Sequence, residues 1–197
     1  MFTGIVTAYE EIKTITNKNG NTFFDIATPE HWHVEVGESV LVNGVCSTVL
    51  ESDSASFQVE YMPETLRLTT VGMQKEGSRV NLERSMKLDD LLSGYVVYGH
   101  IDGMGTVDAI EEDGDSHIIT LTHSAEFDRY IISKGAIVIN GVALTAINPK
   151  PTQFQVAIIP HTWEHTNLQH VQVGDRVNLE YDVIAKYIEK IYGTQRE

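Results

Sequence analysis

The chain has 197 residues, enough for two modest hydrophobic cores, and its formal net charge of −14 argues against nucleic-acid binding, which depends on cationic side chains neutralising phosphates. Its single cysteine, Cys46, excludes an internal disulfide, and no apolar stretch is long enough to span a membrane. The first residues do not resemble a secretion signal, so we expect a cytoplasmic protein.

Short β-prone runs separated by turn residues fill the first half of the chain. After an opening run at 2–9, strands are predicted over 23–28, 39–43, 57–61 and 80–82. The stretch 63–66 begins with a proline followed by an acid, which is typical of a helix start. Short strands at this spacing favour a small closed barrel over an α/β sheet.

The second half repeats this pattern and then ends differently. Strands are predicted over 105–110, 116–122, 136–139, 153–159 and 177–181, and a short capped helix over 124–127. The spacing of apolar residues predicts an amphipathic helix over 183–192. The apolar stripe of this helix requires cover, either from a barrel or from another subunit, and we expect an oligomer contact.

The two halves are related by an internal duplication. A shift of 97 residues aligns 43–83 with 140–180 without a gap, and about 16 of the 41 positions are identical. Each copy contains an Asn-Gly pair, at 43–44 and 140–141, which is a strong signal for a tight hairpin. The strand after the first hairpin directs Cys46 and Thr48 to one side, and we expect Ala143 and Thr145 to share a side in the second. The sequence therefore predicts two similar domains.

The residues alone identify little chemistry. His161 and His165 could chelate a metal on one helix face, but no third ligand is suitably spaced, so we expect no metal site. No glycine-rich phosphate loop is present. His100 is the titratable group best placed for proton transfer near neutral pH. Cys46 is either a nucleophile or a small apolar strand residue.

Several motifs, in order, resemble those of riboflavin synthases of the α-chain, lumazine-binding type. They are MFTGIV at 1–6, VNGVC at 42–46, MPETL at 62–66, VNLER at 80–84, GHIDG at 99–103, YI and KG at 130–135, VNLE at 177–180, Asp182, and Lys186 with Tyr187. The resemblance implies an all-β fold of two tandem, homologous six-stranded Greek-key barrels, at 1–88 and 89–182. It also implies a trimer held together by a C-terminal helix and tail at 183–197.

The resemblance further implies a dismutation that requires no external cofactor. Two molecules of 6,7-dimethyl-8-ribityllumazine exchange a four-carbon unit, giving riboflavin and a ribitylamino-pyrimidinedione. One substrate molecule would bind the first barrel of one subunit, and the other would bind the second barrel of a neighbour. Such a reaction would depend mostly on the orientation of two bound rings, assisted by proton transfer.

The resemblance assigns site residues by position. The first pocket would be lined by Gly4, Ile5, Val6, Cys46, Ser47, Thr48, Glu60, Tyr61, Met62, Pro63, Glu64 and Thr65. The second would be lined by Gly99, His100, Ile101, Lys134, Ala143, Leu144, Thr145, Ala157, Ile158, Ile159, Pro160, His161 and Thr162. The expected catalytic residues are His100 for proton transfer, Ser39 or Cys46 for the nucleophilic adduct, Thr48 and Thr145 for orienting the rings, and Asp182.

Four positions depart from the family pattern. An acid is usual at Asn140, a serine at Ala143, a histidine at Tyr95 and a leucine at Ser47. Asn140 and Ala143 are both expected in the second pocket, where they would remove a charge and a hydroxyl. An alternative function is therefore that of the lumazine proteins, which bind the same ligands as fluorescent antennae without catalysis. A third possibility is a structural duplicate that binds no ligand.

Overall fold

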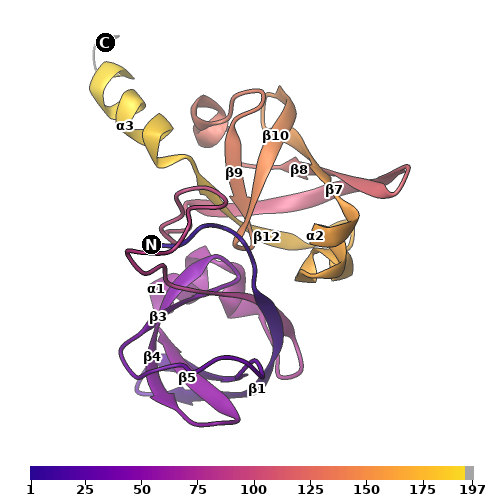
Figure 1. Cartoon of the computed structure of the whole chain (residues 1–197). Coiled ribbons are helices and arrows are strands. Elements are labelled where there is room, and N and C mark those ends of the chain that lie inside the picture. The colour runs from indigo at the N-terminus through magenta and orange to yellow at the C-terminus, as the bar shows by residue number, and fades with distance from the viewer. Residues whose placement is uncertain (194–197) are drawn as a thin grey trace.

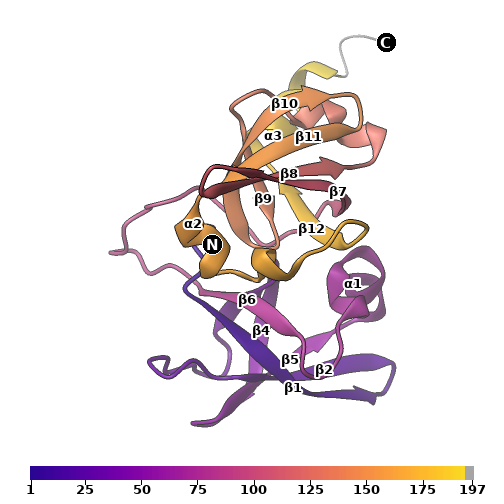
Figure 2. The same cartoon turned by 90° about the vertical axis from the view of Figure 1, so that its right-hand side faces the viewer.

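Two closed β-barrels lie one on the other in the computed structural model, which describes residues 1–193 (Figures 1 and 2). The first barrel has the strand order β1-β2-β5-β4-β3-β6. Its strands are β1 (Ala8–Lys18), β2 (Asn21–Ala27), β3 (Ser39–Val42), β4 (Val45–Ser52), β5 (Ser56–Tyr61) and β6 (Arg79–Arg84). Between β5 and β6 lie the helix α1 (Pro63–Leu68) and the 3-10 helix η1 (Thr70–Met73).

The second barrel has the same topology, with the strand order β10-β11-β8-β7-β12-β9. Its strands are β7 (Gly103–Asp113), β8 (Ser116–Thr122), β9 (Ala136–Ile139), β10 (Val142–Lys150), β11 (Gln153–Ile158) and β12 (Arg176–Tyr181). Its helical elements are η2 (Ala125–Tyr130), α2 (Pro160–Glu164) and η3 (Asn167–His170). Each barrel has its own apolar core, so the predicted fold of two tandem six-stranded barrels is confirmed.

The structure adds detail at the β-prone opening run, and one predicted helix cap was wrong. Residues 2–7 do not form a continuous strand, because β1 begins at Ala8; Phe2 instead forms an isolated bridge with Val97 of the second half. The predicted short helix after β8 is present as the 3-10 helix η2, but Ser124 does not cap it; its hydroxyl donates to the side chain of Glu126 instead. The first difference depends on a long-range contact, whereas the Ser124–Glu126 hydrogen bond is local.

A network of buried asparagines joins the two barrels. Each contact that it makes from the first half to the second has an equivalent contact from the second half to the first. The Asn81 side chain donates to the carbonyl of Asn140 at 2.9 Å, and the Asn178 side chain donates to the carbonyl of Asn43 at 2.7 Å. The backbone amide of Thr70 donates to Asn178 Oδ1 at 2.7 Å. The network explains why the VNLE motif occurs in both halves. The asparagine of each motif forms hydrogen bonds to backbone groups that are buried between the barrels.

Replacing Asn178 with leucine is expected to lower the free energy of unfolding by about 2–5 kcal/mol. The leucine would leave the amide of Thr70 and the carbonyl of Asn43 buried without a partner, in a residue that is 0% exposed. Urea unfolding of Asn178→Leu and of the surface control Asn21→Leu measures the difference. Equal losses in the two variants would show that the network does not stabilise the interface.

The helix α3 (Val183–Tyr192) follows β12 and projects from the second barrel (Figure 1). Its bounds agree with the predicted amphipathic helix. Asp182 caps it by accepting the amide of Ile184 at 2.7 Å, and an ion pair of 3.0 Å joins Arg129 in η2 to Glu189. The apolar side chains of α3 are largely exposed: Ile184, Tyr187, Ile188, Ile191 and Tyr192. Residues 194–197 of the predicted tail lie outside the described residues.

Candidate functional site

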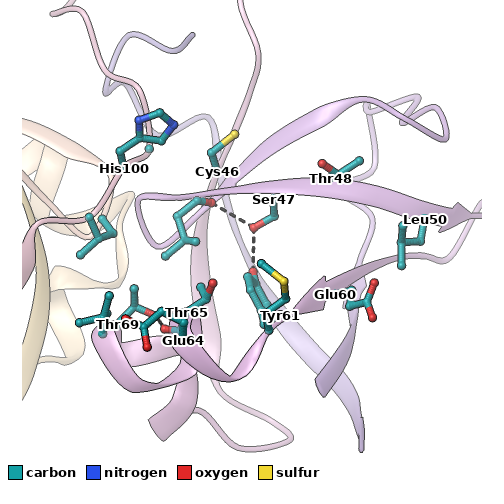
Figure 3. Close-up of a pocket in the computed structure, with 15 residues that line it drawn as sticks. Cys46, Ser47, Thr48, Leu50, Glu60, Tyr61, Glu64, Thr65, Thr69 and His100 are labelled. Atoms are coloured by element: carbon teal, nitrogen blue, oxygen red, sulfur yellow. Dashed lines mark hydrogen bonds between the residues drawn. The ribbon is translucent and has the colours of Figure 1, made fainter. Parts of the chain in front are cut away.

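A pocket of about 480 Å³ opens at one end of the first barrel (Figure 3). Its volume is in the range of small-molecule sites. The walls come from β4, the end of β5, α1 and a segment of the second half at 99–101. The lining residues are Val45, Cys46, Ser47, Thr48, Leu50, Glu60, Tyr61, Met62, Glu64, Thr65, Leu68, Thr69, Gly99, His100 and Ile101.

The first hairpin determines which side chains of β4 are accessible to a ligand. Asn43 and Gly44 both have positive φ, at 46° and 83°, as the tight turn requires. Beyond this turn Cys46, Thr48 and Leu50 are exposed while Val45, Ser47 and Val49 are buried, so the predicted alternation is confirmed. Leu50 was not predicted as a lining residue, although it extends the same alternation by one step. Val45, Leu68 and Thr69 were also missed, and the last two lie one helical turn after Glu64 and Thr65. Pro63 was expected in the pocket but does not line it.

Gly99 holds His100 beside Cys46 (Figure 3). The carbonyl of Gly99 accepts the amide of Cys46 at 3.0 Å, and a Cβ on Gly99 would lie 2.7 Å from that amide nitrogen. Gly99 has a φ of 76°, which glycine adopts without strain. The Glu180 carboxylate accepts the amides of Tyr98 and Gly99 at 2.8 and 2.9 Å, and burial raises its pKa. A buried acid of the second barrel therefore positions one wall of the first pocket.

The same contact occurs in reverse on the second barrel. The Glu83 carboxylate accepts the amides of Thr3 and Gly4 at 2.6 and 2.9 Å, and the carbonyl of Gly4 accepts the amide of Ala143 at 2.8 Å. The predicted allocation of the two glycine segments was therefore wrong. Each half begins with a leading segment that precedes its barrel, at residues 4–6 and 99–101. Residues 4–6 of the first half lie against the second barrel, and residues 99–101 of the second half line the first pocket.

A buried hydroxyl pair forms part of the pocket floor (Figure 3). The hydroxyls of Ser47 and Tyr61 lie 2.9 Å apart, and Ser47 also donates to the carbonyl of Val45 at 3.1 Å. Burial raises the pKa of Tyr61, so its hydroxyl stays protonated and donates to Ser47. This pair explains how serine replaces the leucine usual at position 47: its polar group is satisfied inside the barrel.

Comparison with known proteins identifies the family. The lumazine binding domain matches the chain twice, over residues 3–85 and 98–182. A riboflavin synthase of Actinobacillus pleuropneumoniae is 40% identical over 191 residues, covering 96% of this chain and 89% of that protein. The chain belongs to the lumazine-binding riboflavin synthase family. A riboflavin synthase of Brucella abortus is 34% identical and covers 100% of both chains.

Solved structures of another flavin-binding protein share the fold of this chain. The crystal structure of LumP complexed with riboflavin has a TM-score of 0.86 and is 28% identical, covering 92% of this chain and 100% of that chain. LumP complexed with flavin mononucleotide has a TM-score of 0.83 at 27% identity, covering 92% and 99%. The fold of the two barrels is thus one that also occurs with bound flavins.

The two barrels of this riboflavin synthase family member differ in the groups they present. At the positions of Cys46, Glu60, Glu64 and His100 in the first pocket, the second barrel has Ala143, Ala157, His161 and Ile5. Thr145 is exposed on β10 as Thr48 is on β4, so both barrels keep this hydroxyl. The His161 ring stacks on His165 with centroids 4.3 Å apart. The groups suited to nucleophilic and acid–base chemistry therefore concentrate on the first barrel.

The remaining predicted residues lie outside the first pocket. Ser39 begins β3 and is the cross-strand partner of Thr48, so it lies beside Thr48 without lining the pocket. Lys134 is exposed at a turn with a φ of 64°, where its amide donates to the carbonyl of Ala146. Asp182 lies beside Tyr95, whose pKa is raised by burial and by this carboxylate.

The predicted position of Asn140 in the second pocket was wrong. Asn140 is 5% exposed and belongs to the asparagine network between the barrels, where its Oδ1 accepts the amide of Asn178 at 2.8 Å. Its side chain binds within the second half, and its backbone carbonyl is the group that contacts the other half, by accepting the side chain of Asn81. Within residues 1–193, no cluster of three or more His, Cys, Asp and Glu side chains could hold a metal ion. Across the same residues, none of the helices has the length and apolar character of a membrane span.

Proposed function

We propose that the chain is a riboflavin synthase. It converts two molecules of 6,7-dimethyl-8-ribityllumazine into riboflavin and 5-amino-6-ribitylamino-pyrimidinedione by transferring a four-carbon unit between them. The observation that carries the proposal is the match of both halves to the lumazine binding domain, combined with riboflavin synthase relatives across the chain. Two equivalent barrels suit a reaction between two identical molecules, and such a reaction needs no cofactor besides its ligands.

The first barrel supplies the chemistry in this proposal. A lumazine ring in the pocket would lie against Cys46 and Thr48, and His100 at the rim would transfer a proton to or from a ring methyl. Cys46 would assist formation of the nucleophilic adduct, with Ser39 supporting Thr48 from the neighbouring strand. Thr48 orients this ring through its hydroxyl.

The second barrel orients the partner molecule. Thr145, with Ala143 and Ala157 beside it, would form a small, flat surface that admits a ring. The remaining predicted contacts on this barrel are Lys134, Leu144, Ile158, Ile159, Pro160, His161 and Thr162, joined by Gly4, Ile5 and Val6 of the leading segment. Asp182, at the junction of β12 and α3, is the remaining catalytic candidate, and Tyr95 lies beside it.

The two molecules meet when the first barrel of one subunit faces the second barrel of another, in a cytoplasmic homotrimer. The exposed apolar stripe of α3 supports assembly through this helix, since such a surface requires cover. Ending the chain after Asp182 is expected to give monomers of about 20 kDa in size-exclusion chromatography with light scattering. A truncated protein that still elutes as a trimer would refute the role of α3.

Turnover of ribityllumazine tests the proposed function. Riboflavin should appear at a rate proportional to protein concentration, with two lumazines consumed for each riboflavin formed. A second candidate, a non-catalytic lumazine or flavin binder, is favoured by the similarity to LumP. That alternative predicts a stoichiometric bound chromophore without turnover. Failure to quench lumazine fluorescence would instead indicate a duplicate that binds no ligand.

A further inference from the structure

The leading segment of the second half is anchored to its own barrel on both sides. Glu180 on β12 is 4% exposed, and its carboxylate accepts the amides of Tyr98 and Gly99 at 2.8 and 2.9 Å. On the other side, the amide of Asp102 donates to a backbone carbonyl of β12 at 3.0 Å. His100, which lines the first pocket, lies between these two anchors. The position of its backbone therefore depends on contacts to the second barrel.

A carboxylate suits these two amides better than a glutamine side chain would. The amide of Tyr98 donates to Oε1 of Glu180, and the amide of Gly99 donates to Oε2. Within residues 1–193, no cationic side chain forms an ion pair with Glu180, so its buried charge depends on these hydrogen bonds. A glutamine offers one acceptor oxygen, and its NH₂ group would face the other amide as a second donor. Glu180→Gln therefore removes one of the two hydrogen bonds and releases the segment.

Glu83 on β6 is the counterpart of Glu180 in the repeat and makes the equivalent contacts in the first half. It is also 4% exposed, and its carboxylate accepts the amides of Thr3 and Gly4 at 2.6 and 2.9 Å. The carbonyl of Gly4 accepts the amide of Ala143 in the second barrel at 2.8 Å. The two acids therefore share burial and bonding, but the segments that they hold contact opposite barrels.

We propose that Glu180 is a positioning residue for the chemistry of the first pocket, although it belongs to the second barrel, and that Glu83 serves the second barrel in the same way. Glu180 acts through Gly99, whose carbonyl accepts the amide of Cys46 at 3.0 Å, and through His100, which follows Gly99 (Figure 3). Loss of its carboxylate moves His100 away from Cys46 while every residue of the first barrel stays unchanged. This inference rests on the proposed function, because it assigns Glu180 to the pocket in which that reaction takes place.

The rate at which iodoacetamide alkylates Cys46 tests this role without requiring turnover. Cys46 is the single cysteine of the chain, and it is exposed in the first pocket beside Gly99. In Glu180→Gln the released segment should uncover the thiol, and we expect alkylation about fivefold faster than in the unmodified protein. Glu83→Gln is the matched control, because its segment contacts the other barrel, and its rate should change less than about twofold. A rate in Glu180→Gln that does not exceed that of Glu83→Gln would overturn the proposal.

Glu180→Asp separates the positioning role from a loss of folding. Aspartate keeps two acceptor oxygens on a side chain that is one methylene shorter, so its alkylation rate should lie between those of the unmodified protein and Glu180→Gln. Urea unfolding checks that each variant folds. If Glu180→Gln does not fold, Glu180→Asp takes its place in the comparison with Glu83→Gln, and equal rates in these two variants would again overturn the proposal.

Mixed oligomers show which barrel Glu180 serves. Glu180→Gln alone should lower turnover about 10- to 100-fold. Co-expression with Thr145→Phe, which covers the second barrel, should restore turnover, whereas co-expression with Thr48→Phe, which fills the first pocket, should not. Restoration by Thr48→Phe, or by neither variant when Thr48→Phe and Thr145→Phe restore each other, would overturn the proposal. If that last pair also stays inactive, the shared site of the proposed function fails, and the alkylation rates alone decide the role of Glu180.

Discussion

Replacing Gly99 with alanine is expected to reduce riboflavin formation at least about 100-fold. A methyl group here would lie 2.7 Å from both the Cβ and the amide nitrogen of Cys46, and the backbone φ of 76° disfavours any residue with a Cβ. The segment would have to withdraw, carrying His100 away from the pocket. The free energy of unfolding should also fall by about 2–4 kcal/mol.

Gly20→Ala is the matched control for Gly99→Ala. Gly20 has a φ of 84°, but an added Cβ would meet nothing within 4 Å. The Gly20→Ala variant therefore has the strain of a positive φ but no steric contact. We expect its free energy of unfolding to fall by about 1 kcal/mol and its turnover to stay unchanged. Steady-state kinetics and urea unfolding of both variants separate the two effects. Full activity in Gly99→Ala would show that the contact between Gly99 and Cys46 does not shape the site.

Replacing His100 with alanine is expected to lower kcat by about 100- to 1,000-fold while changing KM little. The imidazole is at the pocket rim beside Cys46, where it can reach a bound ring without forming most of the binding surface. Its loss removes the group best suited to proton transfer near neutral pH.

His33→Ala provides the control for His100→Ala, because His33 is an exposed histidine on the loop between β2 and β3, away from the pocket. Its kinetics should match those of the unmodified protein. If His100→Ala retains kcat but raises KM, the imidazole contributes only to binding. That result would transfer the acid–base role to another group.

The sequence predicted the repeated architecture because its signals are local. The Asn-Gly turns, the alternation after Gly44 and the apolar spacing of 183–192 each depend on neighbours in the chain. The allocation of Gly4 and Gly99 to pockets was not predictable in this way. It depends on Glu83 and Glu180, each of which binds the leading segment of its own half and holds it against the opposite barrel. Such a crossing leaves no periodic pattern.

The role of Asn140 shows the same limit. The family resemblance suggested a pocket residue, whereas its side chain is buried and accepts the backbone amide of Asn178 on the neighbouring strand of the same half. The duplicated motif alone could not distinguish a residue retained for ligand binding from one retained for joining the halves. The equivalent contact in the first half joins Asn43 and Asn81, and the side chain of Asn81 then crosses to the carbonyl of Asn140.

Mixed oligomers test most directly whether two pockets on neighbouring subunits hold the reacting molecules. Thr48→Phe fills the first pocket and Thr145→Phe covers the equivalent surface of the second barrel, and each variant alone should be inactive. Co-expressing the two variants in equal amounts should restore about one quarter of normal turnover. Each site in a closed ring needs an intact first barrel from one subunit and an intact second barrel from its neighbour, and each of these is present about half of the time. Mixed oligomers that remain inactive would contradict a site shared between subunits.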